Sequence, residues 1–229
     1  YSKVDHNEDL KKIIKQNING ISKISSNRLL DELKKLVLSN GFTKISKDEF
    51  CKEIISLIFP QLTKLDIFNN VNDYSKKIIE EKDFIFLISL MIVDGTDNDE
   101  YFIYKYNISN NDKKRIRFLS NLFYKNLKKD TFTEKNLWKI FYLEGKDHLN
   151  DLINFKLLEN KKLDKKLIKL KEFFQTKEVP KFEIKANTLI EKYNYKEGKE
   201  LGNKLSEIEE FWIENSFKIS DKDLEKIVK

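Results

Sequence analysis

The sequence has few residues of the kinds that make turns, disulfides and membrane spans. It holds six Gly and two Pro among 229 residues, whereas all-β folds need turn residues at intervals of about 8–12 positions. The single cysteine, Cys51, excludes an internal disulfide and fits a reducing, cytoplasmic setting. The longest apolar run covers residues 84–93, well short of the roughly 18 residues that span a bilayer. Two His and one Cys are too few for a His/Cys metal site.

Hydrophobic residues make up 40% of the chain and charged residues 36%, a composition typical of a helical protein with a sizeable core. Apolar residues recur at helical spacing through most of the chain. The sequence therefore predicts an all-α fold, a multi-helical array. Val179-Pro180 is the clearest boundary along the chain, because the residue before Pro is pushed out of the helical region.

Helix starts are predicted from residues whose side chains can accept hydrogen bonds from free backbone N–H groups. These are Ser25 or Ser26, a capping box from Ser46 to Glu49, Asn72 or Asp73, Ser109, Thr133 and Ser220. Asn40-Gly41 is expected to end the helix that begins near Ser25, and Gly145 the one that begins at Thr133. The run at residues 84–93 is assigned to the helix starting at Asn72 or Asp73, and residues 94–100 to an acidic loop.

Positive charge is concentrated in the middle third of the chain. Residues 105–172 carry 18 basic and 9 acidic side chains, a net charge of +9, whereas residues 1–104 carry a net −2 and residues 180–229 a net −1. Such an excess indicates a polyanionic partner. Solvated lysine faces are the alternative, because only three of the basic residues are Arg.

Two clusters of basic residues are the candidates for contact with phosphate groups. One comprises Lys113, Lys114, Arg115, Arg117 and Lys125, and the other comprises Lys161, Lys162, Lys165 and Lys166. Lys128 and Lys129 follow the first cluster, but lysines at that end of a helix also simply suit its dipole.

Two further segments have a recognisable order of residues. Residues 180–217 read PKFEIKANTLIEKYNYKEGKELGNKLSEIEEFWIENSF, with a Pro-x-Phe start, a Leu-Ile helix, a Gly-x-x-x-Gly step and a Phe-Trp-Ile ending. Residues 23–33 read KISSNRLLDEL. Both segments resemble the class II tRNA nucleotidyltransferase (CCA-adding enzyme) and bacterial poly(A) polymerase family. The chain departs from the family pattern at Lys23, Asn27, Glu183 and Ala186.

The resemblance implies that the array consists of neck, body and tail subdomains without the catalytic head, and the start at Tyr1 rather than Met fits a fragment. The neck remnant is then expected at residues 1–65, the helical body at 66–179 and the C-terminal tail at 180–229. It implies that the whole enzyme adds CCA or A residues to RNA 3′ ends, using Mg²⁺ and ATP or CTP held by the head. The chain itself is then expected to hold no cofactor, to be inactive alone, and to position tRNA or another RNA for its own N-terminal head.

The resemblance also implies roles for particular residues. Lys23, Ser25, Arg28 and Glu32 would lie on the nucleotide side of the neck, where Arg28 and Glu32 have the spacing of a helical ion pair. In the tail, Gly198, Lys199 and Gly202 are candidates for RNA contact, because free amides at a helix start attract phosphate. Close packing against another helix is the alternative for Gly202. Of Phe211 and Trp212, one is expected in the core with Leu205 and Ile208, and the other against the body.

The sequence does not separate CCA addition from poly(A) addition, because in the family the residues that choose the nucleotide lie mostly upstream of the position that matches Tyr1. The oligomeric state is unknown, and no membrane partner is expected. A helical protein-interaction module without an RNA role is the alternative function.

Overall fold

The computed structural model describes residues 8–39, 41–69, 71–122, 131–160 and 162–228, and over these ranges the fold is all-α. The N-terminal part contains α1 (Glu8–Asn17), η1 (Ile18–Lys23), α2 (Ser26–Val37), α3 (Phe42–Ile45), α4 (Glu49–Ile58) and η2 (Leu65–Phe68), where η marks 3₁₀ helices. The middle contains α5 (Asp73–Glu81), α6 (Phe84–Ile92), α7 (Asn98–Lys105), α8 (Asn110–Ser120), α9 (Glu134–Glu159) and α10 (Lys165–Gln175). The tail contains α11 (Ala186–Tyr193), α12 (Lys199–Glu214) and α13 (Asp221–Val228).

Five of the six predicted caps begin a helix. The side-chain oxygens of Ser25, Asn72, Ser109 and Thr133 each accept a hydrogen bond from a backbone N–H three residues on. Ser220 and Asp223 form a reciprocal capping box at α13. The cap of α4 is different from the prediction: the Asp48 carboxylate accepts from Cys51 N–H at 2.8 Å, while the Ser46 hydroxyl donates to the Thr43 carbonyl.

Three helix boundaries were predicted wrongly. Helix α2 ends at Val37, and Gly41 precedes the short α3 with an ordinary negative φ of −92°. The helix predicted to run through residues 84–93 is broken in two, because Asp83 caps a new helix by accepting from Phe86 N–H at 2.9 Å. Helix α7 begins within the segment predicted to be an acidic loop.

Helix α9 changes direction at Gly145, which has φ 83° and ψ 178°. These angles lie in a region that is essentially open only to Gly. The predicted ending of a helix near Gly145 is therefore present as a sharp kink, and the helix continues on the other side to Glu159. The kink lets the two halves of α9 pack in different directions, with α10 and α8 as its main neighbours.

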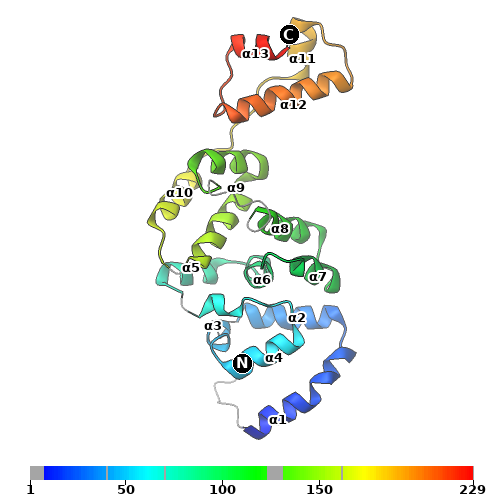
Figure 1. Ribbon diagram of the computed structural model, residues 1–229, viewed down its shortest axis with the longest axis vertical. Coiled ribbons are helices and arrows are strands. Elements are labelled where there is room, and N and C mark those ends of the chain that lie inside the picture. Colours follow the sequence, from blue (N-terminus) through cyan, green and yellow to red (C-terminus); the bar gives the residue numbers. More distant parts are fainter. Residues whose placement is uncertain (1–7, 40, 70, 123–130, 161, 229) are drawn as a thin grey trace.

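Two separate hydrophobic clusters hold the fold together. The larger one extends from Leu33 to Phe174 and includes the almost completely buried helix α6. The smaller one lies in the tail, around Leu189, Ile208 and Leu224. The predicted neck-body boundary at residue 65 falls inside the large cluster, and the predicted tail boundary at 179–180 falls between the two clusters. The helices form an elongated stack, with α1 to α4 at one end and the tail at the other (Figure 1).

Aromatic side chains join the tail to the body. The ring of Trp212 lies 5.2 Å from the ring of Tyr142 in α9 and 4.9 Å from the ring of Phe217. Phe217 also approaches Trp138 of α9, at 6.0 Å between ring centres. Trp212 therefore takes the predicted position against the body, whereas Phe211 is half-buried and outside the tail cluster that contains Ile208.

Polar groups reinforce this junction. The Tyr142 hydroxyl donates to the Glu209 carboxylate, and Lys139 forms an ion pair with Glu214. Burial and the Glu209 carboxylate raise the pKa of Tyr142 to about 12, so the phenol keeps its proton at neutral pH. Across the residues that the structure describes, no helix is both long enough and apolar enough to cross a lipid bilayer.

Candidate nucleic-acid interface

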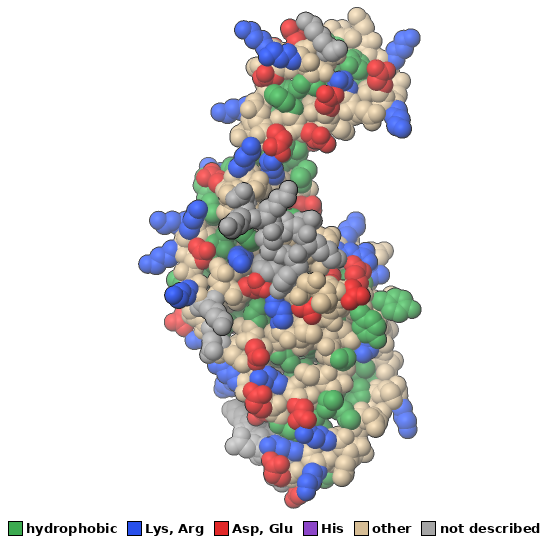
Figure 2. Space-filling model, viewed as in Figure 1, with side chains coloured by type: hydrophobic (Ala, Val, Ile, Leu, Met, Phe, Trp, Pro, Cys, Tyr) green, Lys and Arg blue, Asp and Glu red, His purple; other side chains and the backbone are tan. Residues whose placement is uncertain are grey.

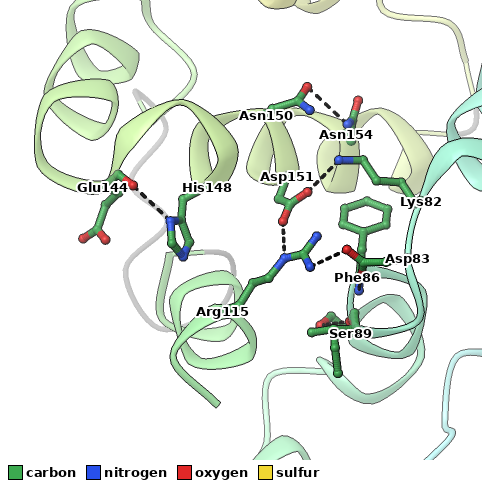
Figure 3. Close-up of polar contacts among 11 residues, drawn as sticks. Lys82, Asp83, Phe86, Ser89, Arg115, Glu144, His148, Asn150, Asp151 and Asn154 are labelled. Carbon is green, nitrogen blue, oxygen red and sulfur yellow. Dashed lines mark hydrogen bonds and ion pairs between the residues drawn. The ribbon is translucent and has the colours of Figure 1, made fainter. Parts of the chain in front are cut away.

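The first basic cluster lies on α8, and its central residue faces the body. Arg115 donates from Nε to Asp151 of α9 at 2.5 Å and from Nη1 to Asp83 at 2.6 Å (Figure 3). Asp151 also accepts from Lys82 Nζ at 2.7 Å, and its side chain is only 3% exposed. The charge of Arg115 is therefore used inside the fold, where it joins α8 to α9 and to the start of α6.

The electrostatics of this network agree with its geometry. Burial disfavours the charged form of Arg115, but hydrogen bonds to Asp151 and Asp83 outweigh it and raise the pKa of the guanidinium. Burial also opposes ionisation of Asp83, yet the Phe86 N–H and Arg115 lower the pKa of that carboxyl below its ordinary value. Arg115 and Asp83 both stay charged because each supplies the opposite charge and the hydrogen bond that the other needs when it is buried.

The other described members of this cluster lie at the surface of α8. Arg117 makes a bidentate ion pair with Glu100 of α7, with two hydrogen bonds of 2.7 Å. Lys114 is exposed and Lys113 is half-buried. Lys125, Lys128 and Lys129 lie outside the described residues. Of the five residues predicted in this cluster, two are thus engaged by carboxylates of the chain itself.

The second basic cluster keeps its charge available. Lys162 is exposed just before α10, Lys165 and Lys166 are exposed in its first turn, and Lys169 follows one turn later on the same face. Among the described residues no carboxylate forms an ion pair with any of these four. Lys161 lies outside the described residues. We call Lys162, Lys165, Lys166 and Lys169 the α10 lysine face; basic side chains project on the side of the molecule where α10 lies (Figure 2).

The two clusters are not brought together. Helix α8 packs against α6, α7 and α9, whereas α10 packs against α9. The two helices lie on opposite sides of the body in the view of Figure 1. A rigid partner such as a duplex would therefore meet one cluster or the other, and the α10 lysine face presents the larger free charge.

The predicted neck residues lie together at the other end of the molecule. Lys23 ends η1, Ser25 caps α2, and Arg28 and Glu32 lie on an exposed side of α2. The predicted pair between Arg28 and Glu32 is wrong: Glu32 accepts from Lys35 Nζ at 2.8 Å. This hydrogen bond lowers the pKa of Glu32, and Arg28 adds a smaller effect. The Arg28 side chain is exposed and has no ion-pair partner among the described residues.

The tail candidates are exposed at the start of α12. Gly198 is the cap residue, with φ 147°, and has no side-chain group to satisfy the first free amides. A Cβ added at Gly202 would meet nothing within 4 Å, so no described part of the chain packs closely against this face. Close packing against another described helix is thus not the reason for Gly202. The neighbouring Glu197 and Glu200 offset the charge of Lys199.

Sequence reasoning missed one member of the α10 lysine face and one further lysine. Lys169 follows Lys165 at i+4, so the helical period could have found it. Lys171 lies on the opposite face of α10, with Leu167 and Phe174, both of which are buried. A lysine at a core position of an amphipathic helix was visible in the pattern but was not singled out.

The structure offers little for a metal ion. Within the described ranges, no group of three or more His, Cys, Asp or Glu side chains could hold one. The Mg²⁺ implied by the family resemblance was predicted for another part of the protein, and this stays a prediction. Neither the protein-family models nor the curated proteins compared with this chain match it. The resemblance of residues 23–33 and 180–217 therefore rests on those two motifs.

Proposed function

We propose that this chain binds RNA through its phosphate backbone, as the RNA-positioning C-terminal region of a template-independent nucleotidyltransferase that extends RNA 3′ ends. The observation that carries the RNA-binding part is the α10 lysine face, four exposed ammonium groups without ion-pair partners among the described residues. The nucleotidyltransferase part rests on the motifs at residues 23–33 and 180–217. Addition of CCA or A residues, with Mg²⁺ and ATP or CTP, belongs to a catalytic head.

Free lysines on one helix face favour a polyanion over a compact ligand. Each ammonium group that meets a phosphate displaces a counterion, which gives affinity that depends on salt and little on sequence. A-form RNA suits this mode because its deep, narrow major groove hides the base edges and leaves the backbone as the accessible surface. The elongated stack of helices gives such a duplex a long surface to lie along (Figure 1).

Binding of tRNA at several salt concentrations tests the proposal. Wild-type affinity should fall steeply with salt, and changing Lys162, Lys165, Lys166 and Lys169 to Gln together should make the slope of log K against log salt shallower by about 3, at roughly 0.7–0.9 for each phosphate that is no longer neutralised. A matched control changes Lys12, Lys34, Lys44 and Lys47 to Gln, four exposed lysines of the N-terminal end. An unchanged slope in the α10 variant, or equal effects in both variants, would contradict the assignment.

A protein-interaction module is the second candidate, and one observation favours it. Tyr101 and Tyr104 of α7 are 57% and 86% exposed, unusual values for two aromatic side chains one helical turn apart. Aromatic residues of this kind are enriched in protein interfaces. If tRNA binding is absent or insensitive to salt, this second function is favoured, and Tyr104→Ser should then weaken capture of the protein partner.

A further inference from the structure

Lys171 occupies a position where the charge of a lysine destabilises the folded state unless an opposite charge compensates it. It lies on the inner face of α10 between the buried Leu167 and Phe174. Its ammonium nitrogen is 5.6 Å from the centre of the Tyr74 ring. Among the described residues no carboxylate forms an ion pair with it. Burial and the nearby Lys82 lower the pKa of Lys171, and Glu81 and Glu172 oppose this effect only in part.

A small cavity adjoins this lysine. It has a volume of about 150 Å³ and lies between the second half of α9 and the end of α10, where Lys146, Asn150, Lys171 and Gln175 line it. The volume corresponds to roughly five water molecules at about 30 Å³ each. Pockets for larger organic ligands measure about 300–1,000 Å³, so this one suits a small ion or a single chemical group.

The polar groups around the cavity are mostly donors. Lys146 uses one N–H to reach the Gln175 carbonyl oxygen at 2.5 Å, which leaves two further donors on the same nitrogen. Asn150 accepts from Asn154 through its side-chain oxygen at 3.3 Å, so its amide nitrogen is left as a donor (Figure 3). Asp147 is the acidic residue of the lining, and it is exposed to solvent.

We propose that this cavity, the α9–α10 pocket, binds one phosphate group. Two ammonium groups and an amide donor around a small space match a tetrahedral oxyanion, and the anion would supply the charge that Lys171 lacks. A cation is disfavoured by the two lysines. The kink at Gly145 positions Lys146 at the pocket, because it turns the second half of α9 toward the end of α10.

The phosphate could be free in solution or part of an RNA backbone. The pocket lies at the end of α10, on the face opposite the α10 lysine face, so an RNA strand would have to cross from one face of the helix to the other to place a phosphodiester in it. This second source rests on the proposed RNA-binding function, whereas binding of inorganic phosphate does not.

Thermal unfolding of the whole chain in inorganic phosphate or in chloride at equal ionic strength tests the pocket. Phosphate should raise the wild-type Tm, and Lys171→Met should abolish that rise while increasing the Tm in chloride, because the uncompensated ammonium is gone. Lys44→Met, which changes an exposed lysine of α3, should keep the phosphate response. The proposal is overturned if phosphate does not stabilise the wild type, or if Lys171→Met still responds. It is equally overturned if Lys171→Met lowers the Tm in chloride, since the Tyr74 contact would then explain the lysine.

An RNA titration separates the two sources. If a backbone phosphate enters the pocket, Lys171→Met should make the salt slope of tRNA binding shallower by about 0.7–0.9, the value for one phosphate, and inorganic phosphate should compete with tRNA. A phosphate response without any effect on tRNA binding identifies free phosphate as the ligand. A phosphate response in a chain that does not bind tRNA supports the pocket and overturns the proposed function. The absence of a phosphate response overturns the pocket alone.

Discussion

Two arginines of α8 show how position decides the use of a charged side chain. Arg115 and Arg117 are two residues apart, so they point in different directions from the helix. Arg115 is held by Asp83 and by the buried Asp151, whereas Arg117 forms a surface pair with Glu100. The sequence could predict that both are basic and helical. It could not predict which one is inward, because Asp151 is 36 residues away along the chain.

Removal of the buried charge at Asp151 should destabilise the fold strongly. Asp151→Asn leaves Lys82 without its carboxylate partner and Arg115 with Asp83 alone, and removing one partner of a buried pair typically costs about 3–5 kcal/mol. The matched surface change, Glu100→Gln, should cost less than about 1 kcal/mol. Urea denaturation followed by circular dichroism measures both. Equal losses of stability in the two variants would show that the Asp151 network is not the stronger support.

The charge of Asp83 should make stability depend on acid pH. The pKa of Asp83 is lower in the folded protein than its ordinary value of 3.8. A carboxyl with a lowered folded pKa stabilises the protein above its unfolded pKa, and this stabilisation is lost as the pH falls through the folded value. Wild-type stability should therefore fall faster below about pH 4 than that of Asp83→Asn, which keeps the helix cap through its amide oxygen. Denaturation at pH 2.5 to 6 measures the difference; parallel curves would exclude the effect.

At the scale of single helices, the sequence predicted what local chemistry determines. The caps at Ser25, Asn72 and Thr133 follow from one side chain and a backbone N–H three residues away. The break at Lys82-Asp83 was missed although residues 80–83 are four consecutive charged side chains and Asp83 is a local cap that accepts from Phe86 N–H. Contacts of Lys82 with α9 and of Asp83 with α8 further fix the start of α6, and these the sequence does not show.

Two glycines in helices should respond to alanine in opposite directions. Gly145 has φ 83° and ψ 178°, a conformation that costs other residues about 1–3 kcal/mol, so Gly145→Ala should destabilise by that amount. Gly202 is an ordinary helical residue with open space around it, so Gly202→Ala should stabilise by about 0.5–1 kcal/mol. Chemical denaturation of both variants is the measurement. Destabilisation by Gly202→Ala would reveal a contact that the fold of this chain does not explain.

On the scale of the whole molecule, the free charge and the family-like motifs lie in different places. The α10 lysine face is in the middle of the stack, whereas the neck residues and the start of α12 lie at its two ends (Figure 1). The charge count of the sequence predicted the basic middle. It could not show that half of the α8 contribution is neutralised within the chain or that α8 and α10 face apart, because both depend on how the helices pack around α9.

The junction between body and tail should govern whether the tail stays folded. The tail cluster contains only five buried hydrophobic residues, and small cores are marginal when they stand alone. Its docking relies on Trp212 and Phe217, and Ser216 and Phe217 both have positive φ angles, 57° and 60°. These strained residues are retained because the turn returns the Phe217 ring to Trp138, Tyr142 and Trp212.

Trp212→Ala should therefore separate the unfolding of the tail from that of the body. We expect calorimetry to show a new transition at lower temperature, since the tail loses its aromatic anchor and the two clusters no longer unfold together. Both tryptophans of the chain lie at this junction. In the variant, Trp138 is the remaining tryptophan, and its fluorescence emission should shift to the red because the tail no longer shields it from water. Tyr104→Ala, which removes an exposed ring, is the control and should leave a single transition. A single transition in Trp212→Ala as well, with unchanged Trp138 emission, would mean that the ion pairs of Glu214 and the Phe217 ring hold the tail in place without it.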